Sequence, residues 1–304
     1  MLPRIVLASV VAVLAVGCGG SPSSVISSYP NAALATKDDV SKFVTTSAAE
    51  IFGEDLIIAQ LGANDAGCPA ITDDGTTQTV TGNGCTDKDG ATWSGSARYV
   101  RADGGLYSGS YQYSGLGYTG GHFTCADGGS GTGGLAIDGT VTMNLSPNST
   151  GTNTFTTDLK VSRTGYDSTI CASRDNVIGL SYSGTAVQVN NSTGTGTVTT
   201  WNGSGKYGSK VDGQISMVTK DEVIDGTVCN SEAASGTTTI TSGGNTAIIT
   251  YDGASKCDPD STVKVSLNGA DQGELSGVSC ATAPGLWWTA GLALIVLALR
   301  RRLA

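Results

Sequence analysis

Histidine, charge and large aromatic side chains are scarce in this chain of 304 residues, and the scarcity of histidine excludes whole classes of site. His122 is the single histidine, so any Ser-His-Asp arrangement would have to use it, and its neighbours carry no catalytic signature. No two cysteines have the CxxC spacing, which argues against zinc and iron–sulfur sites. The chain also has no nucleophile elbow, zincin motif or phosphate loop. We therefore expect no metal, no cofactor and no catalytic residue.

Positive charge is scarce as well. The chain has 17 Lys and Arg against 26 Asp and Glu, which gives a formal net charge of −9. Because binding to nucleic acid needs Lys and Arg at the phosphates, we expect no nucleic-acid partner. Charged residues make up only 14% of the chain, which differs from the composition of disordered, highly charged proteins. The sequence therefore predicts a folded, acidic protein.

Glycine, in contrast, is abundant, with 44 residues, and it often follows Asp or Asn in dipeptides typical of hairpin turns. Asn83-Gly84 and Asp103-Gly104 are two examples. Between such turns, apolar and polar residues alternate with the period of a β-strand. The pattern predicts strands at Thr77–Thr81, Thr92–Arg101, Leu106–Tyr113, Leu135–Leu145, Thr152–Val161, Ile178–Val189, Thr195–Trp201, Val211–Lys220, Val223–Cys229, Thr237–Thr241, Thr246–Tyr251 and Thr262–Leu267.

The fold class that follows is mostly β. We expect an N-terminal helix over residues 34–63 and an antiparallel β meander over residues 64–279, curled into a sandwich or a barrel. The helix is predicted from Thr36 as its N-cap and from Val40 and Phe43, which begin an apolar stripe at helical spacing. A β-solenoid remains the alternative, although no repeat of fixed period is visible.

The first residues, 1–17, have an apolar run after Arg4 and are expected to form a secretory signal peptide. The small residues before Cys18 resemble a bacterial lipoprotein lipobox, and this resemblance implies acylation of Cys18. Residues 18–33 are then expected to form a lipid anchor and a flexible Ser/Pro-rich tether.

The last residues, 280–304, combine Cys280, an apolar run from Gly285 to Leu299 and the cluster Arg300–Arg302. The apolar run is at the short end of what spans a bilayer, and the arginines favour the cytoplasmic side. The segment resembles the C-terminal sorting tails of myxobacterial envelope proteins, the MYXO-CTERM type. The resemblance implies processing at or near Cys280 and display at the cell surface or in the outer membrane. A plain C-terminal membrane anchor is the alternative.

Six further cysteines are present, an even number that predicts disulfide bonds in an exported chain. In a meander, strands that are neighbours in sequence are also neighbours in space, so we expect pairing in chain order. The predicted bonds are Cys68–Cys85, Cys125–Cys171 and Cys229–Cys257.

Function is predicted only in outline. The leading hypothesis is a structural or adhesive protein of the cell envelope without catalysis, held at the membrane and in contact with extracellular polysaccharide or another surface protein. The second is a carbohydrate-binding module that uses a strip of three tyrosines sharing strand parity, and the third is an envelope hydrolase that uses carboxylates. Asp87-Lys88-Asp89-Gly90 has features of a calcium loop, but the 12-residue frame and the terminal Glu of such a loop are missing, and a tight turn explains the same residues. The strip consists of Tyr107, Tyr111 and Tyr113.

Overall fold

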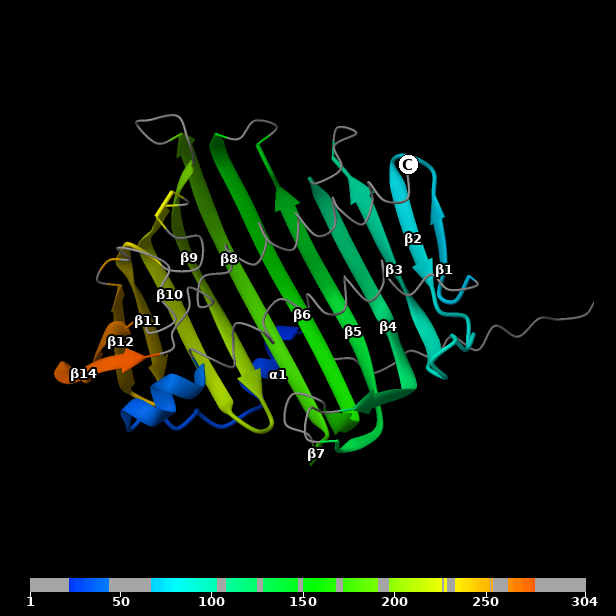
Figure 1. Ribbon diagram of the computed structural model, residues 1–304, viewed down its shortest axis with the longest axis horizontal. Helices are drawn as coiled ribbons and strands as arrows, with labels where there is room; N and C mark the ends of the chain where they lie inside the picture. Colours follow the sequence, from blue (N-terminus) through cyan, green and yellow to red (C-terminus); the bar gives the residue numbers. More distant parts are fainter. Residues whose placement is uncertain are drawn as a thin grey trace, which may run out of the picture.

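One antiparallel β-sheet dominates the protein (Figure 1). The computed structural model describes residues 22–43, 67–102, 108–124, 128–146, 150–167, 172–190, 197–225, 227–228, 233–251, 253 and 262–276. The elements in these residues are α1 (Pro22–Ser27), β1 (Ala70–Asp73), β2 (Thr77–Thr81), β3 (Thr92–Arg101), β4 (Gly109–Thr124), β5 (Ser130–Asn144), β6 (Gly151–Asp167), β7 (Ala172–Ser173), β8 (Asn176–Asn190), β9 (Thr197–Ser209), β10 (Gly213–Asp225), β11 (Ser235–Ser242), β12 (Asn245–Tyr251), β13 (Thr262–Leu267) and β14 (Ala270–Ser276).

The strands follow one another across the sheet in chain order from β1 to β14, and only β7 lies off this path, paired with β6. Each neighbouring pair is antiparallel, so the predicted mostly-β meander is confirmed. Since a solenoid stacks parallel strands, the β-solenoid alternative is wrong. In the described residues β1 and β14 do not pair with each other, so the sheet is open rather than closed.

Several predicted strands have the observed bounds, namely β2, β3 and β13. The predicted strands Val211–Lys220 and Val223–Cys229 overlap a single strand, β10 (Gly213–Asp225), whose pairing register shifts between Thr219 and Glu222. A β-bulge of this kind inserts extra residues without ending the strand. Sequence periodicity did not find β1, β7 and β14, which are short and carry few buried side chains.

The two faces of the sheet differ. The inner face, which carries the buried side chains, includes Ile178, Leu180 and Tyr182 of β8, whereas Ser183 on the outer face is exposed. The buried inner-face residues form one hydrophobic cluster that extends from Val80 on β2 to Leu275 on β14. The sheet therefore shares a single core along its whole width.

The N-terminal segment contacts both faces of the sheet. α1 lies on the outer face, where Ile26 is buried above Gly179 and Gly208, and it appears behind the sheet in Figure 1. A Cβ atom at Gly179 would lie 2.6 Å from Cγ1 of Ile26, so the glycine is needed for this close approach. The flexible tether expected at residues 18–33 is thus wrong for residues 22–33. These residues pack because Ile26 is buried against β8 and β9, two strands that lie far from it in the sequence.

The chain then continues to the inner face. A parallel bridge joins Asn31 to Gln214, and Leu34 and Val40 are fully buried. Residues 37–43 are helical, and Phe43 contacts Tyr207 edge-on with ring centroids 6.4 Å apart. Thr36 is the N-cap as predicted: the backbone N–H of Asp39 donates to Oγ1 of Thr36 at 3.2 Å. The rest of the predicted helix, residues 44–63, lies outside the described residues.

The predicted disulfide Cys68–Cys85 is confirmed and ties the start of β1 to the turn after β2. The other four cysteines lie outside the described residues, in connections between strands. Because neighbouring strands are antiparallel, β4 and β6 point the same way and finish at the same end of the sheet, and β10 and β12 both finish at the other end. The connections that contain Cys125 and Cys171 therefore start from one end of the sheet, and those with Cys229 and Cys257 start from the opposite end.

Candidate functional site

The tyrosine strip lies on the inner face near the first edge of the sheet. Tyr99 of β3 stands directly opposite Tyr111 of β4, and their rings stack at 4.1 Å between centroids and 14° between planes. Tyr113 continues the stack at 6.3 Å from Tyr111. Tyr111 and Tyr113 thus share one face as predicted, and Tyr99 joins them from the neighbouring strand. Tyr107 lies outside the described residues.

Burial determines what these rings can contact. Tyr99 is 5% exposed and Tyr113 is 7% exposed, and Tyr113 belongs to the hydrophobic core. Burial raises the pKa of Tyr99, Tyr111 and Tyr113 above the ordinary tyrosine value, so all three hydroxyls stay neutral over the physiological range. A sugar ring stacks on an exposed aromatic face, whereas these faces are occupied by one another. The strip therefore offers little surface to a carbohydrate.

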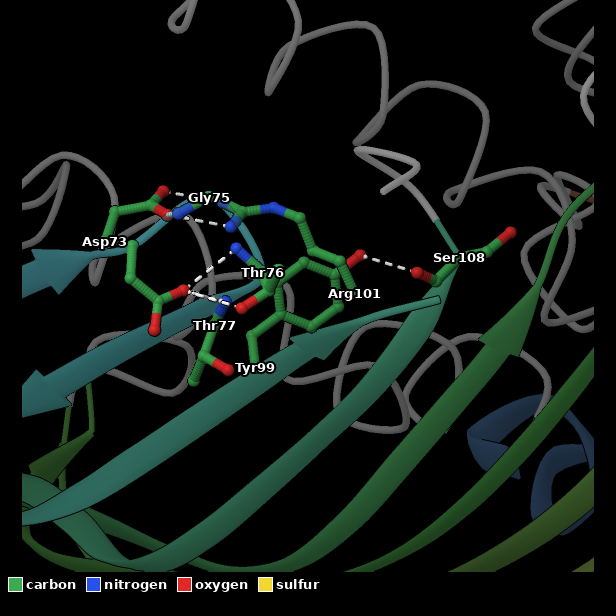
Figure 2. Close-up of polar contacts among 8 residues, drawn as sticks. Asp73, Gly75, Thr76, Thr77, Tyr99, Arg101 and Ser108 are labelled. Atoms are coloured by element: carbon green, nitrogen blue, oxygen red, sulfur yellow. Dashed lines mark hydrogen bonds and ion pairs between the residues drawn. The ribbon is translucent and has the colours of Figure 1, made fainter. Parts of the chain in front are cut away.

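A salt bridge closes the end of the strip (Figure 2). Arg101 donates from both terminal nitrogens to Asp73, at 2.8 and 2.6 Å, and its guanidinium carbon lies 5.6 Å from the centre of the Tyr99 ring. These hydrogen bonds from Arg101 hold the pKa of Asp73 below its usual value. The hydroxyl of Tyr99 donates to the carbonyl oxygen of Ser108 at 3.2 Å. The polar groups drawn in Figure 2 therefore join β1, β3 and the start of β4.

The carboxylate of Asp87 stabilises the turn that the sequence offers as the alternative to a calcium loop. Its Oδ1 accepts from the backbone N–H groups of Asp89 and Ala91, both at 2.9 Å, and its Oδ2 accepts from Nε1 of Trp93 at 2.8 Å. Both oxygens are therefore used by the turn. Nowhere in the described ranges do three His, Cys, Asp or Glu side chains gather as metal ligands. His122 lies exposed on β4.

A site that sequence reasoning missed surrounds Glu222. The register shift in β10 turns Glu222 inward, opposite Trp201, and its side chain is 0% exposed. Asp221, just before it, has a positive φ of 49°, a conformation that non-glycine residues rarely adopt. Neither carboxylate oxygen of Glu222 has a hydrogen-bond partner. Burial raises the pKa of Glu222 well above its ordinary value, which favours the neutral acid.

Hydroxyl groups lie on the same inner-face region as Glu222. The hydroxyls of Thr219 and Thr238 are 3.1 Å apart, and that of Thr238 is 3.1 Å from the hydroxyl of Tyr251. Tyr182 covers Gly203, and its hydroxyl has no hydrogen-bond partner. Burial and the nearby Glu222 raise the pKa of Tyr182. We call Glu222, Thr219, Thr238, Tyr251 and Tyr182 the Glu222 cluster. It is a polar island within an apolar core, and its charge state depends on pH.

The outer face has a different chemistry, because rows of aligned side chains cross it from strand to strand. One row crosses β4 to β12, and a second runs parallel to it two residues further along each strand. We call the two rows the hydroxyl face. The first row is Ser110, Thr142, Thr156, Ser183, Ser204, Val218, Thr239 and Ile248, and the second is Gln112, Thr140, Asp158, Ser181, Lys206, Ser216, Thr241 and Thr246.

Most side chains of the hydroxyl face are exposed or half-buried and neutral. Thr142 donates from its hydroxyl to that of Ser110 on the neighbouring strand at 3.3 Å, so hydroxyls within a row are in contact distance. α1 bounds the face at one end, since Gly179 and Gly208 lie next to Ser181 and Lys206. The result is an open polar surface that several strands share.

No family model, no curated protein and no solved structure matches the chain. Among the described residues, no helix has the length and apolar character to cross a bilayer. Residues 1–21 and 277–304, with Cys18, Cys280 and the apolar tail, lie outside the described residues.

Proposed function

We propose that the protein is a structural or adhesive β protein of the cell envelope that carries out no catalysis. The observation that carries this proposal is the hydroxyl face, which extends across eight strands of one sheet and remains open to solvent. Adhesion uses a broad, stable surface rather than a deep pocket. A shared core and the Cys68–Cys85 disulfide support such a surface from behind.

The remaining observations favour this function over the two alternatives. The tyrosine strip is stacked and largely buried, so it gives little support to a carbohydrate module built on it. The carboxylates of Asp73 and Asp87 accept hydrogen bonds from neighbouring groups, which makes them poor acid–base groups for a hydrolase. Glu222, although its pKa is raised, has no exposed surface through which a polymer would reach it.

The proposed location is the outer membrane or the cell surface, with the membrane as a partner through Cys18 and the tail at residues 280–304. The support comes from the two terminal signals in the sequence. Pro22 of α1 is the fourth residue after Cys18, a span of at most about 14 Å for an extended chain. An acyl chain on Cys18 would therefore hold the sheet close to the membrane surface.

Metabolic labelling tests the location. In a Cys280→Ser background, a palmitate analogue should label the chain, and the further change Cys18→Ser should abolish the label. Equal labelling with and without Cys18 would refute acylation at this residue. Peptides from the mature surface protein should lack residues 286–299 if the tail is removed, and their recovery would show that the tail is an anchor instead.

Bead adhesion tests the function. Beads coated with the mature chain should be retained under flow on a layer of the source cells' extracellular matrix, whereas beads coated with the reduced and alkylated chain should not. Retention equal to that of albumin-coated beads would contradict the adhesive role. Release of soluble fragments from cell-envelope polymers by the purified chain would instead support the hydrolase alternative.

A further inference from the structure

We propose that the hydroxyl face binds a neutral polysaccharide, laid across the strands from β4 to β12. This inference rests on the proposed adhesive function and names the class of partner and the surface that contacts it. It moves sugar binding away from the tyrosine strip, whose rings are already stacked on one another. Three features of the face lead to this ligand class: its charge, its spacing and its few apolar side chains.

Charge excludes an acidic ligand and favours a neutral one. In the two rows of the hydroxyl face, the charges of Asp158 and Lys206 cancel, although the whole chain carries −9. Further acidic residues lie at the ends of strands that carry the face, as at Asp175, Asp212 and Asp225. An anionic polymer or nucleic acid would be repelled by this rim, since like charges oppose association. A neutral, polyhydroxylated chain meets no such barrier.

Spacing suits a repetitive ligand. Neighbouring strands lie about 4.8 Å apart, and residues on one face of a strand recur about every 6.7 Å. The hydroxyl face therefore presents donors and acceptors on a regular grid, and each Ser or Thr hydroxyl can both donate and accept. A polysaccharide also repeats its hydroxyls along its length, so a long chain would form many weak contacts at once. Multivalent contact of this kind raises the overall affinity without any single strong site.

The apolar side chains of the face supply the second component of sugar recognition. Val218 is 50% exposed and Ile248 is 37% exposed, both in the first row, and Thr239 lies between them. Sugar rings have C–H faces as well as hydroxyls, and burying such faces on valine and isoleucine is favourable. Val187 and Val189 of β8 are also exposed on the outer face, but a protein partner would need a larger contiguous apolar centre than these scattered side chains offer.

Retention assays on immobilised polysaccharides test this inference. The full mature chain is passed over dextran, a neutral β-1,3-glucan and galactomannan, with alginate as the acidic polymer. Thr142→Glu with Ser183→Glu places two carboxylates on the face, two strands apart, and Ala172→Glu with Ser173→Glu adds the same charge on exposed β7. We expect wild type and the β7 variant to bind one of the neutral polymers within about twofold of each other, because exposed charges act weakly at a distance.

The variant on the face should bind that polymer about tenfold more weakly or worse, since each carboxylate must be desolvated under the ligand. Thr142→Val with Thr156→Val removes hydroxyls without adding charge and should also weaken binding, which covers the case in which the Glu variant fails to fold. Equal binding by wild type and the Val variant would overturn the inference, as would preference for alginate. Adhesion of wild-type beads without binding to any neutral polymer would overturn this inference but not the adhesive function, whereas loss of both would refute both.

Discussion

A Glu222→Gln substitution should change how the stability of the protein depends on pH. Burial raises the pKa of Glu222 above the value of 4.5 that it has in the unfolded chain. Below pH 4.5 both states are protonated, so the neutral acid costs the folded state no ionisation energy. As the pH rises above 4.5, the unfolded chain releases this proton while the folded chain keeps it. The contribution of Glu222 to stability is therefore full at low pH and is lost progressively up to its folded pKa.

The slope of this loss follows from linkage. One proton bound by the folded state but not by the unfolded state lowers the free energy of unfolding by about 1.4 kcal/mol for each pH unit. The loss accumulates over the pH range between the unfolded and the folded pKa of Glu222. Domains of this kind have about 5–15 kcal/mol of stability, so the effect is large enough to measure. Glutamine does not titrate, and the variant should lack this slope.

Urea unfolding at several pH values from 4 to 8 measures the effect, with the disulfides intact. Other acids contribute the opposite slope, because hydrogen bonds lower the pKa of Asp39 and Asp73, so the informative quantity is the difference between wild type and variant. The free energy of unfolding of Glu222→Gln should rise relative to that of wild type by about 1.4 kcal/mol for each pH unit above 4.5. Glu274→Gln, at an exposed position on β14, is the matched control for removal of a surface carboxylate. Parallel curves for wild type and Glu222→Gln would refute the reasoning. Glu222→Met should reproduce the result if glutamine does not pack.

Three further predictions concern the parts of the fold that hold the sheet together. Ile26→Ala should lower the free energy of unfolding by about 2–4 kcal/mol in thermal or urea unfolding, whereas exposed Ser27→Ala should leave it nearly unchanged; equal effects would show that α1 is not part of the core. Thr36→Ala should cost about 1 kcal/mol in the same assay through loss of the N-cap, and no change would contradict the capping role. Non-reducing peptide mapping should recover the pairs Cys125–Cys171 and Cys229–Cys257, each of which joins two connections that start from the same end of the strands. A disulfide that joins connections from opposite ends would contradict the strand register.

Much of the fold was predictable because its signal is local. In β13, Val263, Val265 and Leu267 alternate with polar residues, and all three are buried on the inner face. Turn dipeptides then fix where such strands end. β14 was not predicted because a single side chain near its end, Leu275, is buried, and an edge strand with one exposed face and one free side has no clear alternation. Its pairing with β13 is a property of the sheet and not of its own seven residues.

α1 shows the same limit in a helix. The segment Pro22–Ser27 has one large apolar residue on its buried side and no amphipathic period, so composition alone predicts a tether. Its site is created by Gly179 and Gly208, more than 150 residues later, which leave room for Ile26 between two strands. Because this contact depends on two glycines elsewhere in the chain, the sequence of Pro22–Ser27 itself contains no signal for it. Only the register between β8 and β9 brings the two glycines together.

The sites follow the same logic. Strand parity correctly put Tyr111 and Tyr113 on one face, but parity does not say whether that face is open to solvent or packed in the core. Glu222 was missed because the alternation of apolar and polar residues that includes Met217 breaks at the charged residues after Thr219. The sequence therefore predicted that one strand ends at Lys220, that the next begins at Val223, and that Glu222 lies in the turn between them. The bulge at Asp221 resets the parity, and Glu222 then takes the inward position that an apolar residue would be expected to fill. A backbone irregularity of two residues therefore places an acid in the core. The chain tolerates it because the folded state favours the protonated acid, which removes the cost of burying a charge.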